Sequence, residues 1–165
     1  MLHNIQNFAK SLTFSCFLLL IFTTFYGCSW REHFIIINET DKEVVLSYEL
    51  TQLDNKNTFP IFQFQPLLGK LTSQNNIDWA SEIPIIDADT TLLGISVKLP
   101  PKSSLKIGSL SNDRYKTYNQ VFINGRVFNL KNIIFYTNEH ETKITPETFD
   151  NFFKKASDGI IFRIK

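Results

Sequence analysis

Cysteine is scarce in this 165-residue chain, and its two cysteines, Cys16 and Cys28, both lie in the N-terminal apolar stretch. A disulfide between them would cross twelve residues, which is about 18 Å of rise along a helix. Disulfide geometry does not allow that span. The chain beyond Cys28 therefore folds without disulfides, as a domain of this length can.

Glycine is also scarce, and the motifs that identify common active sites are missing. With six glycines in all, the sequence offers few residues for a glycine-rich phosphate-binding loop. It contains neither the G-x-S-x-G motif of serine hydrolases nor the H-E-x-x-H motif of zinc metalloproteases. The acidic run Asp87-Ala88-Asp89 has Leu92 where a calcium loop needs glycine and Lys98 where it needs glutamate. The sequence therefore predicts no metal site, no cofactor and no enzymatic activity.

An excess of charge of one sign is absent as well. Of the 17 basic residues only Lys10 precedes Cys28, which leaves 16 basic against 16 acidic residues beyond it. Proteins that bind nucleic acids use a basic surface to displace counterions from phosphates. The neutral balance therefore predicts no nucleic-acid partner.

What the sequence does contain is an apolar N-terminal run that follows a single lysine. Residues 11–27 are nearly all apolar or small, and no acidic residue occurs before Glu32. This order of positive charge and then apolar residues is typical of a secretory signal, and the run is at the short end of what spans a bilayer. Since Lys10 stays on the cytoplasmic side, we expect the chain after the run to be translocated.

The run closes with the motif Phe25-Tyr26-Gly27-Cys28. This end resembles the signal peptide of bacterial lipoproteins, in which small residues precede a cysteine that is diacylated and becomes the mature N-terminus. The resemblance implies a signal peptide over residues 1–27, a lipid on Cys28 and a tether over residues 28–32. It also implies a membrane-anchored position outside the cytoplasm, at the periplasmic face, the outer membrane or the cell surface. An uncleaved signal anchor and cleaved export without a lipid are the alternatives.

Over residues 33–165, the spacing of apolar residues predicts a single β-rich domain. Residues 33–38 form a continuous apolar run, which suits a strand covered on both faces. Alternation at period two predicts further strands, over residues 43–51, 62–65, 93–99, 105–107 and 160–164. Short strands separated by turn residues predict an antiparallel β-sandwich, with a small barrel and one covering helix as the alternative. The pattern over residues 33–51 is similar to the first hairpin of immunoglobulin-like domains, which implies an immunoglobulin-like fold.

Two local signals refine this prediction. Asn124-Gly125 lies between two apolar triplets and predicts a tight hairpin. Thr145-Pro146 predicts the start of a helix, and an apolar stripe from Phe149 to Ala156 extends that helix over residues 146–156, before the last strand. Residues 66–91 have the weakest pattern and are interpreted as a long loop.

Aromatic residues in polar segments supply the candidate binding residues. Trp79, Tyr115 and Tyr118 fall in turn-like stretches, where exposed rings suit sugar or protein recognition. His140, between two glutamates, is the only plausible seed of an active site, but adjacent residues of an extended chain point to opposite faces. The sequence thus predicts a non-catalytic binding or assembly module with a protein or glycan partner in the envelope. Carbohydrate or cell-wall binding is the alternative, and an enzyme with a site around His140 is the weaker one.

Overall fold

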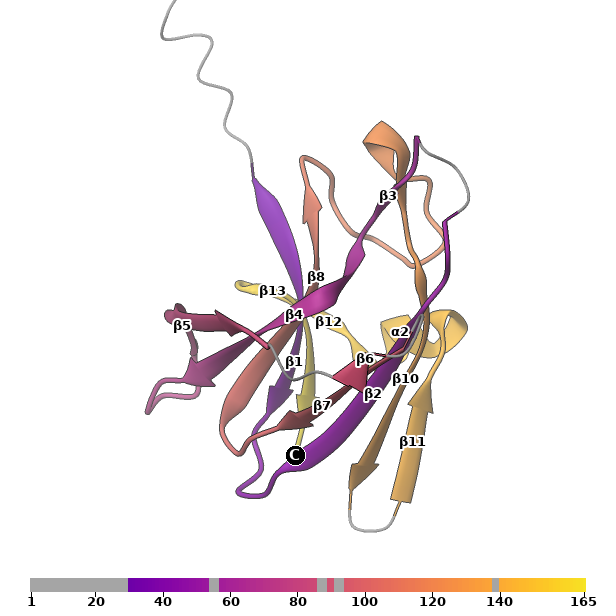
Figure 1. Cartoon of the computed structure of the whole chain (residues 1–165). Coiled ribbons are helices and arrows are strands. Elements are labelled where there is room, and N and C mark those ends of the chain that lie inside the picture. The colour runs from indigo at the N-terminus through magenta and orange to yellow at the C-terminus, as the bar shows by residue number, and fades with distance from the viewer. Residues whose placement is uncertain (1–29, 54–56, 86–88, 91–93, 138–139) are drawn as a thin grey trace, which may run out of the picture. The chain divides into compact units, whose positions relative to one another are not determined.

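Two β-sheets pack against each other in the computed structural model of the protein (Figure 1). The structure describes residues 30–53, 57–85, 89–90, 94–137 and 140–165. In spatial order, the six-stranded sheet consists of β12 (Lys154–Ala156), β13 (Gly159–Ile164), β1 (Arg31–Asn38), β8 (Ser103–Ser111), β4 (Phe62–Leu71) and β5 (Ile77–Pro84). The five-stranded sheet consists of β11 (His140–Ile144), β10 (Leu130–Thr137), β2 (Val44–Leu50), β7 (Gly94–Leu99) and β6 (Asp89–Thr90). The other elements are β3 (Phe59–Pro60), β9 (Arg126–Val127), the 3-10 helix η1 (Ile123–Gly125) and the helix α2 (Pro146–Phe152).

The two sheets enclose a common apolar core because alternate residues of their strands face inward. The buried residues of β2 and β7 are Val44, Leu46, Tyr48, Leu50, Ile95, Val97 and Leu99. Residues of β1, β8 and β13 reach the same core from the facing sheet, and Phe149 of α2 closes it. The predicted mainly β fold with sandwich-like packing is thereby confirmed, while the likeness to immunoglobulin domains stays a prediction.

β1 is buried on both faces, as its continuous apolar run predicts. Phe34 and Ile36 face the common core, whereas Ile35 and Ile37 pack on the outer face of the sheet with Ile77. β1 pairs with β8 in antiparallel fashion and with β13, the predicted last strand, in parallel. This parallel pair is an exception to the predicted antiparallel arrangement. Almost the whole domain separates the two strands, so no tight turn fixes their relative direction.

The C-terminal helix starts where predicted but ends earlier. The Thr148 hydroxyl accepts a hydrogen bond from the Thr145 N–H (2.9 Å), and Pro146 opens α2. The prediction that the helix continues to residue 156 is wrong, because Phe153 is extended and Lys154–Ala156 pair with β13. This pairing satisfies the backbone groups and still leaves Phe153 buried in the core.

The hairpin predicted at Asn124-Gly125 is wrong, although its backbone conformation is present. Asn124 and Gly125 have φ values of 56° and 67°, which are the left-handed values that such a turn needs. They belong to η1, and β9, which follows, pairs in parallel with β3. A Cβ atom on Gly125 would lie 2.5 Å from the Asn57 carbonyl oxygen, so glycine permits the close approach of these segments.

The described part of residues 66–91 is built of strands, so its interpretation as a loop is wrong. It contains much of β4 and all of β5, which form an antiparallel hairpin. Two bulges break the alternation that would have revealed this hairpin. Residues 63–66 of β4 oppose only Ile107 of β8, and residues 79–82 of β5 oppose only Gly69 of β4.

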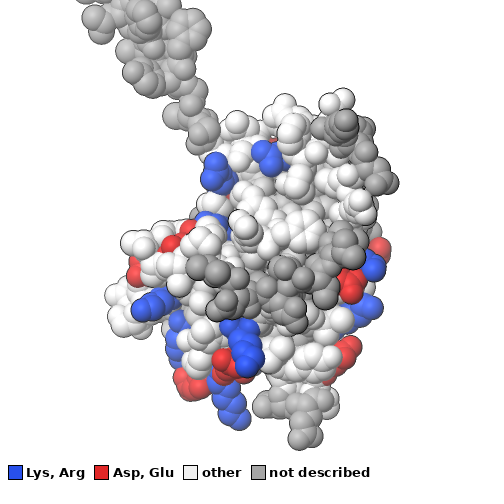
Figure 2. Space-filling view, in the orientation of Figure 1, with Lys and Arg blue, Asp and Glu red and all other residues white. Residues whose placement is uncertain are grey.

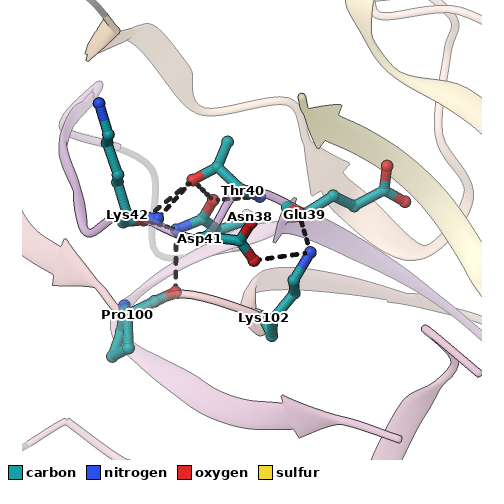
Figure 3. Close-up of polar contacts among 7 residues, drawn as sticks. All are labelled: Asn38, Glu39, Thr40, Asp41, Lys42, Pro100 and Lys102. Carbon is teal, nitrogen blue, oxygen red and sulfur yellow. Dashed lines mark hydrogen bonds and ion pairs between the residues drawn. The ribbon is translucent and has the colours of Figure 1, made fainter. Parts of the chain in front are cut away.

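β1 and β2 lie in different sheets, so the predicted first hairpin is wrong as a strand pairing. The turn between them is held by Asn38, whose side chain is fully buried (Figure 3). Its amide nitrogen donates to the carbonyl oxygens of Lys42 (2.8 Å), Leu99 (3.1 Å) and Pro100 (2.9 Å). Its oxygen accepts from the N–H (3.0 Å) and the hydroxyl (2.7 Å) of Thr40. One buried amide thus directs the chain from the first sheet to the second.

Candidate binding surface on the β4–β5 hairpin

The bulge over residues 79–82 places Trp79 on the outer face of the six-stranded sheet. The Ser81 hydroxyl organises this bulge, because it accepts a hydrogen bond from the Lys70 N–H (2.7 Å) and donates one to the Asp78 carbonyl oxygen (2.8 Å). Bulges commonly redirect a side chain next to a functional site. Here the redirected side chain is the tryptophan that the sequence singles out.

Trp79 contacts one side chain of β1 and one of β8, which lie beyond β4 in the sheet. Its ring centroid lies 5.1 Å from that of His33 on β1, with the ring planes tilted by 45°. The Lys106 Nζ, on β8, lies 5.5 Å from the centroid of the indole, within the range of a cation–π interaction. Lys106 also forms an ion pair with Glu82, and both of these side chains are mostly buried. The indole is thereby held in place, and 40% of its surface is exposed.

His33 supplies a neutral aromatic surface to this cluster. Its Nδ1 is buried without a hydrogen-bond partner among the described residues. Burial and the nearby Lys106 ammonium lower the pKa of the imidazole below its ordinary value, Arg31 acts in the same direction, and Glu82 opposes them. The folded protein therefore disfavours the imidazolium, and the uncharged ring packs against Trp79.

An apolar groove of about 300 Å³ borders the bulge. The apolar residues that line it are Leu68, Leu71, Ile83, Pro100 and Pro101. Ile83 is more than half exposed although it belongs to a strand. Trp79 and the groove together are called the hairpin surface below, since both belong largely to β4 and β5.

The hairpin surface joins a fixed aromatic ring, exposed aliphatic side chains and a mostly buried ion pair. The chain has no significant match among protein-family models, curated proteins or solved structures. The chemistry of the surface is therefore argued from its own geometry. Exposed tryptophans with fixed rings are enriched where proteins bind one another, and indole faces also stack on sugars. The arrangement suits recognition of a partner.

The other two predicted binding residues are not part of this surface. Tyr115 is buried, its hydroxyl donates to the Asp150 carboxylate (2.6 Å), and its ring centroid lies 5.1 Å from that of Phe34. The expectation that the Tyr115 ring is exposed is therefore wrong. Burial and the Asp150 carboxylate raise the pKa of Tyr115, so its hydroxyl remains a donor. Tyr118 is half-buried, with its ring centroid 6.1 Å from that of Phe128.

The remaining candidates lie apart from Trp79 or outside the described residues. His140 is exposed at the start of β11. Its neighbour Glu141 accepts a hydrogen bond from the Tyr136 hydroxyl (2.9 Å), which raises the pKa of Tyr136. Glu139 and Cys28 fall outside the described residues.

Within the residues that the structure describes, no three His, Cys, Asp or Glu side chains gather closely enough to hold a metal ion. None of the helices in those residues combines the length and apolar character needed to cross a bilayer.

Proposed function

We propose that this protein is a lipoprotein of the cell envelope, tethered to a membrane by a lipid on Cys28, and that its β-sandwich is a non-catalytic binding or assembly module. The order of Lys10, the apolar run over residues 11–27 and Cys28 supports the tether and a location outside the cytoplasm. The binding role rests on Trp79, which stays 40% exposed while His33 and Lys106 hold its ring.

The favoured partner is a protein of the envelope. A ring that is already fixed loses little conformational entropy when a partner covers it, so more of the contact energy appears as affinity. The groove beside the bulge offers apolar surface for a partner's aliphatic or aromatic side chains. Both features lie on β5, the edge strand of the sheet, but on opposite faces, because Ile83 pairs with the core-facing Leu68 whereas Trp79 packs with Lys106 on the outer face. A partner that wraps around this edge can use them together.

A glycan is the second candidate partner, and the ion pair favours it. Lys106 and Glu82 lie beside Trp79. A sugar that stacks on the indole would find there a donor and an acceptor for its hydroxyl groups. Cell-wall material supplies such sugars outside the cytoplasm.

The tether is tested by Cys28→Ser. Each buried methylene contributes about 0.8 kcal/mol, so several acyl chains on one residue anchor a soluble domain stably. We expect the variant to move from the membrane fraction to the soluble fraction, and mass spectrometry of the wild-type N-terminus to show the acyl groups. If Cys28→Ser remains entirely with membranes, the apolar run is itself the anchor and the lipid tether is wrong.

The binding role is tested by photo-crosslinking from position 83 in intact cells and by Trp79→Ala. We expect a crosslinker at position 83 to form a discrete adduct that Trp79→Ala abolishes. Trp30→Ala is the matched control, because Trp30 has the same exposed fraction of 40%, and it should leave the adduct intact. Retention on purified cell-wall material that Trp79→Ala abolishes would favour the glycan. Unchanged adducts and unchanged cell-wall retention in Trp79→Ala would refute the binding role of the hairpin surface.

A further inference from the structure

The end of the sandwich at which β1 begins is built largely by one long connection. Arg31, the first residue of β1, pairs with Ser111, the last residue of β8. The chain then continues through residues 112–122 into η1 and β9, and β9 pairs with β3. In Figure 1 the start of β1, η1 and β3 lie at the upper end of the domain, and the C-terminus lies at the lower end. This upper end is called the β1 end below.

Exposed apolar side chains gather at the β1 end. Val121 is 96% exposed, Ile123 is 49% exposed and Phe59 is 54% exposed. Phe59 pairs with Arg126, which directly follows η1, and the Arg126 guanidinium lies 5.9 Å from the centroid of the Phe59 ring. Exposed apolar side chains that gather in one patch among polar residues mark interaction sites for proteins or membranes.

Hydrogen bonds keep these side chains from folding back onto the core. The Asp113 carboxylate accepts from the Ile123 N–H (2.9 Å), which fixes the start of η1. The Glu32 carboxylate accepts from the Tyr115 N–H (2.7 Å), which fixes the connection against β1. The exposure of Val121 and Ile123 is therefore part of an ordered turn.

The connection that builds the β1 end contains more basic than acidic residues. The connection over residues 112–126 contains Arg114, Lys116 and Arg126 against one acidic residue, Asp113, whose carboxylate is already hydrogen-bonded to the backbone. Figure 2, in the same orientation, shows this end as mostly uncharged surface with a few basic side chains, whereas acidic and basic side chains crowd the lower half. Exposed apolar side chains accompanied by basic ones suit the headgroup region of a bilayer that contains anionic lipids.

We propose that the β1 end docks onto the bilayer that holds the lipid on Cys28, with Val121, Ile123 and Phe59 inserted among the lipid headgroups. This inference rests on the proposed tether. Only three residue steps separate Cys28 from Arg31, and an extended chain spans at most about 10 Å over that distance. A lipid on Cys28 therefore leaves the start of β1 next to the membrane surface, and the exposed apolar turn belongs to the same end of the domain.

The experiment uses the full chain, purified from membranes, with the single substitution Val121→Cys. Processing would remove Cys16 and acylation would block Cys28, so the introduced thiol is unique. The thiol carries an environment-sensitive fluorophore, and the protein is reconstituted in vesicles of phosphatidylethanolamine and phosphatidylglycerol that contain a spin-labelled lipid as quencher. Val45→Cys is the matched control, because Val45 is 44% exposed on β2, just after the turn at the opposite end of β1.

We expect a blue-shifted emission and loss of fluorescence to the lipid quencher at position 121, and neither at position 45. Equal, weak quenching at both positions in an acylated protein would overturn the docking and leave the tether intact. Labelling of Cys28 itself would show that it is not acylated, which would overturn the tether and this inference together. Protection of position 121 from a soluble quencher in cells, without quenching in vesicles, would overturn the docking in favour of a protein partner.

Discussion

The Asp150 carboxylate, on α2, accepts hydrogen bonds from three residues of one connection. Its donors are the Tyr115 hydroxyl (2.6 Å), the Thr117 hydroxyl (2.8 Å) and the Tyr118 N–H (3.4 Å). Hydrogen bonds to a charged acceptor are about twice as strong as neutral ones. A single carboxylate therefore fastens the connection that follows β8 to the helix that closes the core.

Tyr115→Phe tests this anchor at the scale of a single residue. The variant keeps the ring in the core but leaves Asp150 without its shortest hydrogen bond, so we expect the free energy of unfolding to fall by about 1–2 kcal/mol. Tyr136→Phe is the control, because it removes a hydroxyl bonded to the Glu141 carboxylate at an exposed position. Urea unfolding of the two variants gives the comparison, and equal losses would show that the Asp150 contact adds nothing to stability.

His33 makes stability depend on pH in a defined direction. Its pKa in the folded protein lies below the ordinary value of 6.5, mainly because of burial, so the unfolded chain binds the proton first as pH falls. The contribution of the neutral ring is present above 6.5 and is lost as pH falls from there towards the folded pKa. When pH is lowered from about 7.5 to 5.5, we expect the free energy of unfolding to fall less in His33→Gln than in the wild-type protein. Parallel losses in both proteins would show that His33 does not contribute to this dependence.

At the scale of elements, the passage from β1 to β2 depends on the hydrogen bonds of Asn38 (Figure 3). Asn38→Asp keeps the shape and the acceptor oxygen but places a carboxylate oxygen against three carbonyl oxygens. We expect the free energy of unfolding to fall by about 3 kcal/mol or more, because those carbonyls lose their donor in a buried site. Asn76→Asp, at an exposed position of the β4–β5 turn, should change it little in the same urea titration. A small effect at Asn38 would show that the turn is held by other contacts.

Strands with one buried face were predictable from the sequence, whereas pairings that depend on distant partners were not. Val44 to Leu50 alternates strictly because one face of β2 packs on the core. The bulge at residues 79–82 removes that alternation from β5, and the pairing of β12 with β13 ends α2 early. Neither event has a local sequence signal.

The candidate surface was predictable to the same limited extent. Trp79 is conspicuous as a large ring in a polar segment, and Lys106 lies between the inward residues Leu105 and Ile107, so alternation alone directs it outward. The contact of Trp79 with Lys106 and His33, however, depends on strand order and on the bulge. Tyr115 is equally conspicuous in the sequence, but its ring is buried and its hydroxyl donates a hydrogen bond to the Asp150 carboxylate, 35 positions later in the chain.

At the scale of the whole molecule, the order of the six-stranded sheet places the last strand in its interior. β13 lies between β12 and β1, and four of its six residues, Ile160, Ile161, Phe162 and Ile164, are buried apolar side chains. A chain that stops at Asp158 loses these side chains and one full edge of pairing for β1. We expect it to show no cooperative thermal transition by circular dichroism, because both cores lose part of their packing. A chain that lacks only Lys165, which is exposed, should melt as wild type does, and a cooperative transition in the shorter chain would contradict the prediction.

The parallel pairing of β1 with β13 also determines when the domain can complete its fold during synthesis. During synthesis, Arg31–Asn38 leave the ribosome well before Gly159–Ile164, because more than a hundred residues separate the two strands. β1 therefore waits with one side unpaired until β13 has emerged. A nascent chain that lacks β13 cannot complete the six-stranded sheet. It can therefore still pass through any translocation channel that accepts only unfolded polypeptide.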